Sequence, residues 1–350
     1  MNDQIAQAFV DTARPNRIAP AVAIDVGNMK ESLWTYTAGH FTYDPSSPQT
    51  TVNTIFDLAS LTKVIATTTL TMRYVDAGIF TLDNKISEHL PDWKGIDRAD
   101  VTIRDLLNHS SGLTSHLPFF NDYRGRSQFE LAICQLPLEY EPRSKSIYSD
   151  LGFMILGFIL SDLSPNRDSL NTQFSNIVKE RNWGTMGYRP PPDWLPRTAP
   201  TEYDPWRGRL LSGEVHDENC FALGGVAGHA GLFATSEAVG RFAQETLRAL
   251  SGEDTFANTA TVNMFQRRSF ISDSSRALGW DTMLPTSSCG KHMSPESIGH
   301  TGFTGTSLWI DPAVNRYVTI LTNRVYPTRA NDAILKFRPE LHNLIFSNSI

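Results

Sequence analysis

The sequence predicts an α+β protein in which the two ends of the chain build one antiparallel sheet and helices are inserted between them. Strand-like runs occur early, at residues 21–26 and 33–41, and return only after residue 277, in ALGWDTM, TSLWIDP and RYVTILTN. The long stretch between them, from about 83 to 268, has helical segments and long loops. We expect helices to pack on the sheet, with a ligand site in the cleft between sheet and insertion.

In chain order, the first two runs form a strand pair around the turn at Gly27-Asn28. A helix follows at about 61–77, and Gly78 is its stop signal. The Pro-rich loop RPPPDWLPRTAP, at 189–200, is the most irregular part of the insertion. After the three late strands, an amphipathic helix at about 331–346 closes the chain. The predicted units are a discontinuous α/β lobe, 1–60 with 275–350, and a helical lobe, 61–274, which act together as one unit.

The amino-acid composition limits the kinds of partner that this protein is expected to bind. The chain has 350 residues, 40% of them hydrophobic, and a net charge of −6, which gives no reason to expect nucleic acid or an anionic membrane surface. Three irregularly spaced cysteines suggest neither a disulfide framework nor a metal cluster. The most apolar window, LGFMILGFIL, is half the length of a membrane span. The first residues lack the pattern of a secretory signal, so the cytoplasm is expected, or the periplasm or medium if a leader was removed. Oligomeric state is not predicted.

Ser60 and Lys63 stand at the start of the 61–77 helix, in ASLTKV. A spacing of three places both side chains on one helical face. The free N–H groups of a first turn can hold an oxyanion, and together with burial they disfavour an ammonium nearby. Lowering a lysine pKa from roughly 10 to roughly 7 costs the charged form about 4 kcal/mol, and the neutral amine is a base within reach of the hydroxyl.

The spacing alone is not specific. About one Ser-x-x-Lys is expected by chance in a chain of this length, and a second copy, Ser288 to Lys291, lies in a turn-like run. Taken alone, the stretch favours a capping serine beside a lysine that extends to solvent. More of the site must therefore be found elsewhere in the sequence.

Two further segments supply what acyl transfer needs, a proton relay and a second oxyanion donor. Tyr148 and Asp150 stand just before the apolar run 151–160, and His300-Thr301-Gly302 leads into a late strand. Glycine there lets the backbone approach a substrate closely. The Tyr-x-Asp copy that starts at Tyr74 lies 14 residues along the Ser60 helix, about 21 Å away, and cannot serve.

With these three motifs in order, the chain resembles the serine β-lactamase and penicillin-binding-protein superfamily, in the branch with class C β-lactamases, D-Ala-D-Ala carboxypeptidases and family VIII carboxylesterases. Ser-x-x-Lys, Tyr-x-Asn and Lys-Thr-Gly or His-Thr-Gly are that branch's motifs. Supporting stretches are VTIRDLLNHSSGL, YSDLGFMILG and GGVAGHAGLFAT. The resemblance spans about 21–323 and implies a β-lactamase/transpeptidase-like fold.

By that resemblance, Ser60 attacks a carbonyl and becomes acylated, while Lys63 and Tyr148 share the proton transfer. The oxyanion is expected between the N–H groups of Ser60 and Phe303. Three further residues, all in the motif that begins at residue 300, are expected to contact substrate, with the threonines on a carboxylate or nearby oxygen: Thr301, Gly302 and Thr304.

Two departures from the family pattern affect the substrate. His300 replaces a common lysine, so a fixed charge becomes one that depends on pH near neutrality. Asp150 replaces asparagine, and a carboxylate can only accept hydrogen bonds. Asp150 near Lys63 favours the ammonium, which makes Tyr148 the working base; in the alternative, Asp150 points away and binds a substrate N–H. The change puts β-lactam hydrolysis in doubt more than acyl-enzyme chemistry.

Asp217 and His229 lie in a Gly-rich part of the insertion and are candidate cleft residues. No ligand-spaced pair such as His-x-x-x-His appears there, so no metal is expected, and no organic cofactor. The resulting hypothesis is a serine hydrolase that cleaves an amide or ester in a small acyl substrate: a peptide ending in D-Ala, an ester or a β-lactam. The alternatives are a family VIII-type carboxylesterase or acyltransferase, and a sensor that is acylated without turnover.

Overall fold

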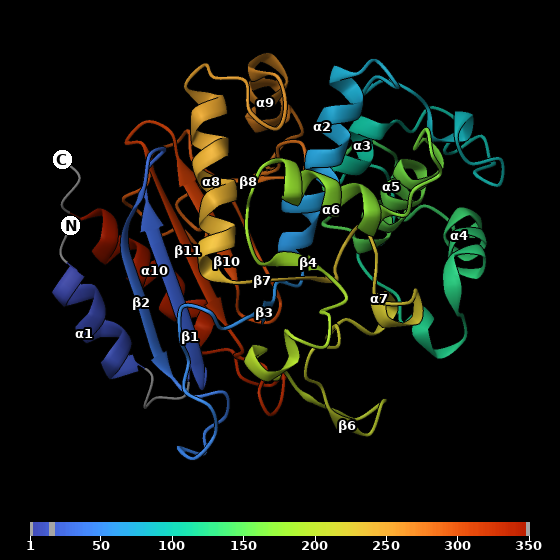
Figure 1. Cartoon of the computed structure of the whole chain (residues 1–350). Coiled ribbons are helices and arrows are strands. Elements are labelled where there is room, and N and C mark those ends of the chain that lie inside the picture. Colours follow the sequence, from blue (N-terminus) through green and yellow to red (C-terminus); the bar gives the residue numbers. More distant parts are fainter. Residues whose placement is uncertain (1–2, 14–17, 348–350) are drawn as a thin grey trace.

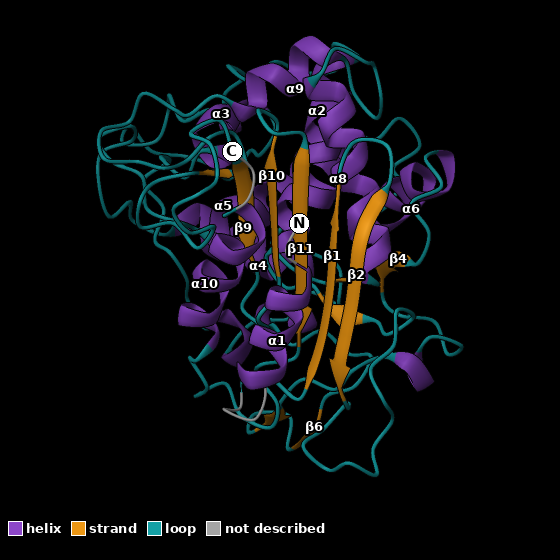
Figure 2. Cartoon of the chain, turned by 90° about the vertical axis from the view of Figure 1, so that its left-hand side faces the viewer, coloured by secondary structure: helices purple, strands orange, loops and turns teal. Residues whose placement is uncertain are grey.

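The computed structural model describes residues 3–13 and 18–347. Its centre is a six-stranded antiparallel sheet with the strand order β2-β1-β11-β10-β9-β8. Strands from the two chain ends therefore lie side by side, as Figure 2 shows for β1 and β11. The strands are β1 (Ala21–Gly27), β2 (Ser32–Gly39), β8 (Asp281–Thr282), β9 (Ile298–Thr301), β10 (Ser307–Asp311) and β11 (Arg316–Thr322).

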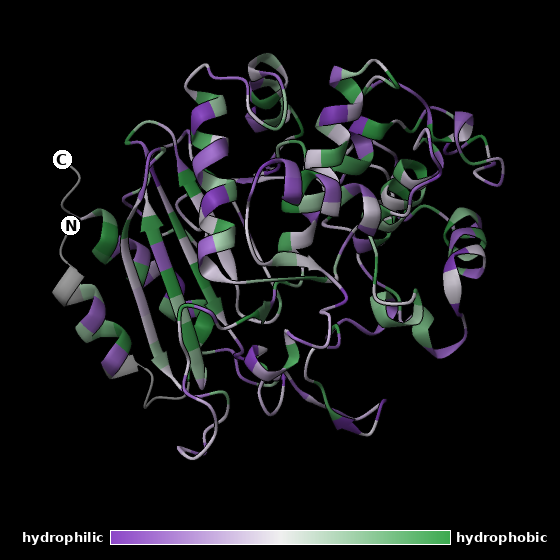
Figure 3. Cartoon of the chain, viewed as in Figure 1, coloured by the Kyte–Doolittle hydropathy of each residue, from purple (hydrophilic) through white to green (hydrophobic). Residues whose placement is uncertain are grey.

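Helices cover both faces of this sheet. α1 (Asp3–Ala13) and α10 (Ile334–Phe346) pack on one face, and α8 (Ser236–Leu250) packs on the other against β1, β10 and β11 (Figures 1 and 2). The alternation of side chains explains this: Trp309 and Val318 face α10, whereas Leu308 and Tyr317 belong to the core on the α8 side. In Figure 3 the central strands are mostly hydrophobic, and α8 carries hydrophilic residues away from the sheet.

The rest of the insertion is helical with long connections, which confirms the predicted α+β class. Its helices are η2 (Lys63–Thr68), α2 (Thr69–Asp76), η3 (Ile86–Glu88), α3 (Ile103–Leu107), η4 (Phe119–Asn121), α4 (Gly125–Gln135), α5 (Asp150–Asp162), α6 (Leu170–Glu180), η5 (Leu195–Arg197), α7 (Glu218–Ala222) and α9 (Thr259–Gln266). The apolar run after Tyr148 is α5, and residues 151–160 are all buried in it. No helix in residues 3–13 or 18–347 has the length and apolar character needed to span a bilayer.

Two small sheets lie apart from the main sheet. β3 (Phe56–Asp57), β7 (Leu232–Ala234) and β4 (Met186–Tyr188) form the first, with β7 in the middle. β5 (Tyr203–Asp204) pairs with β6 (Arg209–Leu210) in the second. β3 matters for the site because it ends three residues before Ser60, so pairing with β7 fixes where the Ser60 helix begins.

The helix after Ser60 differs from the α-helix predicted at 61–77. Residues Lys63–Thr68 form a π-helical segment before α2 begins. The hydroxyl of Thr68 donates to the carbonyl of Lys63 at 2.8 Å, and Thr67 donates to Gly228 O at 2.7 Å. These threonine hydroxyls compete with backbone N–H groups for the carbonyls that they bind. Short π-helical segments are frequent at functional sites. The helix ends as predicted, with Gly78 at a φ of 65°.

Candidate active site

Ser60 stands on a sharp turn between β3 and the helix. Ala59, just before it, has a φ of 47°, a left-handed conformation that is strained for a residue with a side chain. The buried carboxylate of Asp57 stabilises the turn by accepting the N–H of Ala59 at 2.8 Å. From the facing loop, Thr306 donates to Leu58 O at 3.0 Å. The backbone around Ser60 is therefore held from two sides.

Lys63 is fully buried directly behind Ser60. Its ammonium nitrogen lies 3.0 Å from Ser60 Oγ, 2.7 Å from Asp150 Oδ1 and 3.1 Å from the carbonyl of His229. Three donors thus meet three acceptors, which accounts for all the protons of a charged amine. A lysine that extends to solvent is excluded by this geometry.

The charge on Lys63 follows from its partner. Burial alone would lower the pKa of Lys63, but the Asp150 carboxylate outweighs it and the pKa is raised above its usual value. Burial likewise opposes the ionised form of Asp150, and Lys63 with the nearby His116 holds the pKa of Asp150 far below its usual range. The pair is an ammonium and a carboxylate at neutral pH, as the Asp150 departure predicted.

Tyr148 lies beside this pair at the N-terminal end of α5. The Lys63 nitrogen is 4.8 Å from the centre of its ring. The rings of His109 and His300 lie at 4.7 and 5.7 Å, and the Arg276 guanidinium at 5.1 Å, each measured to the same ring. Burial raises the pKa of Tyr148, while Lys63 and the Ser60 hydroxyl act in the opposite direction. Burial outweighs these two effects and Asp150 adds to it, so the pKa of Tyr148 is raised and its side chain is a neutral phenol.

Two backbone N–H groups are available for an oxyanion. The N–H groups of Ser60 and Phe303 donate to no other described residue. Arg338 on α10 donates to the Gly302 carbonyl at 3.2 Å and to the Thr306 carbonyl at 3.0 Å. Gly302 O belongs to the same trans peptide unit as Phe303 N–H and points the opposite way, so Arg338 orients that N–H. A side chain at Gly302 would meet Leu58 O at 2.5 Å, which explains the glycine.

Ser60 and Tyr148 open into a cleft of about 520 Å³. Arg276, Arg324 and Arg338 line it, and no ion pair joins any of these three to a carboxylate within residues 3–13 and 18–347. Arg324 is otherwise used: its Nε donates to Phe303 O at 2.8 Å. The cleft beside the nucleophile is therefore cationic, although the chain as a whole is acidic.

His300, Thr301 and Gly302 line the cleft as predicted, but two predicted roles need correction. Burial, with Arg276 and Lys63 nearby, holds the pKa of His300 well below its ordinary value, so His300 is neutral rather than titrating near pH 7. Its Nδ1 lies 2.8 Å from Thr301 O. Thr304 is fully buried and its hydroxyl donates to Asp57 O at 2.7 Å, so Thr304 braces the Ser60 turn instead of contacting substrate.

Asp217 and His229 lie together but do not line the cleft. His229 Nε2 is 2.9 Å from Asp217 Oδ1, and His229 is 1% exposed. The main-chain carbonyl of His229, not its ring, reaches the site by accepting from Lys63. Asp217 also accepts the N–H of Cys220 as the N-terminal cap of α7. This pair holds the strand segment that Lys63 contacts.

Sequence reasoning missed three residues of the site: Arg276, Arg338 and His116. His116 is partly exposed, and its Nδ1 lies 3.6 Å from Asp150 Oδ2, the oxygen that Lys63 does not bind. The nearby Asp150 carboxylate raises the pKa of His116. None of the three lies in a recognisable local motif, because each reaches the site from a distant loop or helix.

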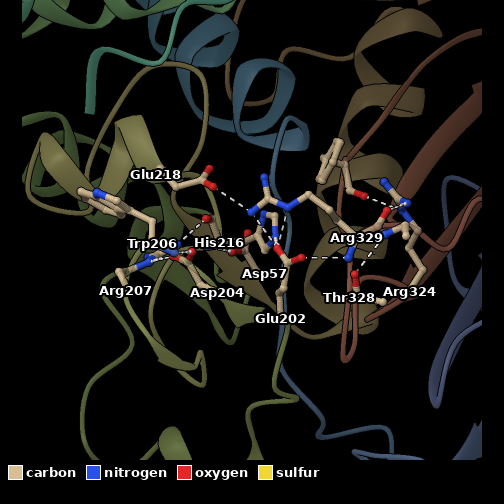
Figure 4. A network of polar contacts seen from close by, with 12 residues as sticks. Asp57, Glu202, Asp204, Trp206, Arg207, His216, Glu218, Arg324, Thr328 and Arg329 are labelled. Atoms are coloured by element: carbon tan, nitrogen blue, oxygen red, sulfur yellow. Dashed lines mark hydrogen bonds and ion pairs between the residues drawn. The ribbon is translucent and has the colours of Figure 1, made fainter. Parts of the chain in front are cut away.

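A network of polar contacts begins at Asp57, which binds the Ser60 turn (Figure 4). Asp57 Oδ2 accepts the N–H of His216 at 2.7 Å, and the His216 ring bonds Glu202 at 2.8 Å. Glu202 binds the side chain of Arg329 at 2.7 Å, and Arg329 continues to Glu218 at 2.7 Å. This chain of contacts joins the Ser60 turn to the loop after β6 and the loop after β11.

The same network reaches the oxyanion site through aromatic contacts. The His216 ring stacks on the Phe303 side chain with ring centres 5.5 Å apart. The guanidinium of Arg324 also contacts Phe303 and lies 4.6 Å from the centre of its ring. The Ser60 turn and the Phe303 side chain therefore both contact this network.

This arrangement of fold and site agrees with the comparisons to known proteins. The family model described as Beta-lactamase matches residues 5–339. A relative from Salmonella agona (strain SL483), provisionally named D-alanyl-D-alanine carboxypeptidase, is 32% identical over 81% of this chain and 72% of its own length. The chain therefore belongs to the β-lactamase family, and the predicted family is confirmed.

Solved structures show the same fold at low identity. The hydrolase EstCE1, described as having promiscuous acyltransferase activity, superposes with a TM-score of 0.74 at 19% identity, covering 95% of this chain and 98% of EstCE1. A class C β-lactamase from Rhodobacter sphaeroides gives 0.74 at 17% identity, covering 97% and 99%. These likenesses show that the chain has the fold shared by these two proteins.

Proposed function

We propose that this protein is a serine hydrolase that cleaves an amide or ester bond through an acyl-Ser60 intermediate, with peptides ending in a free carboxylate, of the D-Ala type, as substrates. The observation that carries the proposal is the arrangement of Ser60, the buried Lys63–Asp150 ion pair and Tyr148 at the mouth of a cationic cleft. The division of the chain into lobes at 1–60 with 275–350 and at 61–274 remains a prediction.

In the proposed acylation, Ser60 Oγ bonds to the substrate carbonyl carbon while its proton passes to the Tyr148 oxygen and the phenol proton of Tyr148 passes to the leaving group. Lys63 stays charged, because Asp150 holds it as an ammonium, and it favours negative charge on both oxygens nearby. The carbonyl oxygen becomes an oxyanion between the N–H groups of Ser60 and Phe303. When the carbonyl re-forms, the bond to the leaving group breaks and that group departs with the proton that it received from Tyr148.

Deacylation follows the same path in reverse order. Water takes the place of the leaving group, Tyr148 accepts its proton, and the oxygen bonds to the acyl carbon. The Ser60–acyl bond then breaks and Ser60 recovers a proton from Tyr148. An alcohol or amine in place of water gives acyl transfer by the same steps, which is the second candidate activity; the likeness to EstCE1 supports keeping it.

The charge of the cleft supports a substrate with a carboxylate on its leaving group. Arg276 lies over the Tyr148 ring, where the leaving group is protonated, and the Thr301 hydroxyl lines the same space. A guanidinium and a hydroxyl are suited to bind a carboxylate. His300 is neutral and contributes no charge, so Arg276 supplies the cation that the family's lysine would supply.

The substrate assignment is tested with three compounds: a neutral chromogenic ester, a chromogenic cephalosporin and a D-Ala-D-Ala peptide. We expect D-Ala release, and we expect Arg276→Gln to raise KM for the peptide at least about tenfold, equal to the loss of roughly one charge-assisted hydrogen bond. For the neutral ester the KM of this variant should change less than about twofold. Arg73→Gln, which removes an arginine outside the cleft, is the matched control.

Two results decide against the proposal. Equal loss on ester and peptide would mean that Arg276 does not read the carboxylate. An adduct on Ser60 with no turnover of any of the three compounds would favour a sensor that is acylated and stays acylated.

A further inference from the structure

A second cavity, of about 330 Å³, lies outside the catalytic cleft and shares no lining residue with it. It is formed by α3, the C-terminal end of α9 and the loop that follows α9, segments that lie in the upper half of both Figure 1 and Figure 2. Its apolar part consists of Met264, Phe270, Ile271 and Leu278. Phe270 is fully exposed, an unusual state for an aromatic side chain beside a cavity. The volume is at the lower end of the range for small-molecule sites, roughly 300–1,000 Å³.

The polar rim of this cavity is cationic. Arg143 is matched by Asp105 at 3.1 Å, and Arg104 is matched by Asp83 at 3.0 Å. Arg267 and Arg268, by contrast, have no carboxylate partner in the part of the chain that the structure describes.

Arg267 and Arg268 differ in the hydrogen bonds that their guanidinium groups make. Arg268 donates to Thr282 Oγ1 at 2.7 Å and to the carbonyl of Met283. The Arg267 guanidinium is exposed and donates to no described residue. An apolar cavity with two unneutralised positive charges at its edge is complementary to an anion with an apolar body. The buried hydroxyl of Ser269, which has no partner among the described residues, adds an unused polar group at the same edge.

Both walls of the cavity lead to Tyr148. In the wall formed by the loop, Ser269 N–H donates to Arg276 O at 2.8 Å, and the Arg276 guanidinium lies 5.1 Å from the Tyr148 ring centre. In the wall formed by α3, Asn108 O accepts from the Ser146 hydroxyl at 2.8 Å, two residues before Tyr148.

The residue after Asn108 strengthens the second connection. The His109 ring packs 4.7 Å from the Tyr148 ring, and its Nδ1 accepts Ser149 N–H at 3.0 Å. A ligand that moves either wall therefore moves a direct neighbour of the phenol. Rigid packing of this kind transmits small shifts instead of absorbing them.

We propose that this cavity binds a small amphipathic carboxylate, with its apolar chain on Met264, Phe270 and Leu278 and its carboxylate on Arg267 and Arg268, and that occupancy changes the turnover rate through Tyr148. The carboxylate forms charge-assisted hydrogen bonds with the guanidinium groups, while the chain covers apolar surface that now faces water. The occupant is a separate molecule, because no carboxylate of the described chain approaches Arg267 or Arg268.

Binding is tested by calorimetry with decanoate, below its micelle concentration, and with decanol as the neutral control. We expect one decanoate per chain, at least about tenfold weaker binding of decanol, and a similar loss of decanoate affinity in Arg267→Gln/Arg268→Gln. Arg276→Gln, which alters the catalytic cleft, should bind decanoate as the native chain does. Thermal melts of both variants check that they are folded. Equal decanoate affinity in the double variant would overturn the site.

The coupling is tested on turnover of the neutral ester and rests on the proposed function, whereas the binding measurement does not need activity. At saturating decanoate we expect kcat to change at least about twofold with KM unchanged, and no response in the double variant. A rise in KM alone would place decanoate in the catalytic cleft and contradict the coupling. Binding with no effect on kcat would contradict it as well.

Discussion

Lys63 combines complete burial with a positive charge, two properties that exclude each other unless a partner is present. Asp150 is that partner at 2.7 Å. Lys63 and Tyr148 therefore have separate roles. Lys63 supplies a permanent positive charge, and Tyr148 transfers the proton. The expectation of a neutral, proton-accepting lysine, which the Ser60–Lys63 stretch supports when taken alone, does not hold once Asp150 is placed.

Replacing Asp150 tests these separate roles. Asp150 raises the pKa of Lys63 against the effect of burial, so Asp150→Asn should lower that pKa and let the ammonium deprotonate at lower pH. We therefore expect the alkaline limb of the kcat profile to move down by at least about one pH unit in the variant. Asp83→Asn, at an exposed ion pair, is the control. An unchanged alkaline limb would mean that activity does not depend on a charged Lys63.

How far the site can be predicted from sequence depends on how local each signal is. Ser60, Lys63, Tyr148 and the motif at His300 are short patterns, readable without coordinates. Arg276 and Arg338 have no such pattern, and their roles exist only because a loop and a C-terminal helix return to the cleft. The pKa of His300 was also beyond reach, since it depends on burial and on Arg276 together.

The turn between β9 and β10 is held mainly from outside its own strands. Arg338 on α10 binds two of its carbonyls, and Thr304 and Thr306 bind the β3 end of the Ser60 turn. Arg324 from the end of β11 binds a third carbonyl, that of Phe303. The two oxyanion donors therefore keep their relative position only if α10, β9 and β3 stay docked.

Arg338→Met tests whether this docking positions the oxyanion donors. Loss of the guanidinium frees the peptide unit of Phe303, and we expect kcat to fall about tenfold or more with KM changed less than about twofold, a smaller loss than deletion of an oxyanion donor. Arg338→Lys keeps a donor for Gly302 O and should recover part of the rate. Kinetics of both variants are measured well below their melting temperatures. Equal loss in both, or a change in KM alone, would assign Arg338 a different role.

Helix type was less predictable than helix position. The sequence predicts the Ser60 helix and its end at Gly78, but the π-helical segment over Lys63–Thr68 depends on Thr67 binding Gly228, some 160 residues away in the chain. A contact at that separation has no counterpart in local periodicity. The position of the main sheet was easier to predict, because the strand-like runs at both chain ends are local signals.

On the scale of the whole molecule, the main sheet contains buried acids that do not serve the site, and Asp25 is one of them. Asp25 on β1 is hydrogen-bonded to Tyr317 at 2.8 Å and to Ser32, and Gly240 of α8 packs closely against it. Burial raises the pKa of Asp25 to about 6. This acid joins β1, β2, β11 and α8, so its protonation state affects the stability of the main sheet.

The sign of that effect follows from linkage. A folded pKa of about 6, above the usual 3.8, means that Asp25 contributes stability below pH 4 that is lost as pH rises through 6. A difference of about two pKa units is worth about 3 kcal/mol. Asp25→Asn removes this dependence, so between pH 4 and pH 8 the native chain should lose up to about 3 kcal/mol more unfolding free energy than the variant. Urea unfolding at both pH values measures this; equal changes in both proteins would refute the assignment.

Whether Ser60 forms the covalent acyl bond can be measured by mass spectrometry of the intact chain and of its peptides. After incubation with a fluorophosphonate or a penicillin, we expect one adduct per chain on the peptide that contains Ser60, none in Ser60→Ala, and turnover in that variant lowered at least about 10³-fold. An adduct on another residue, or an unmodified chain that still hydrolyses substrate, would contradict the account.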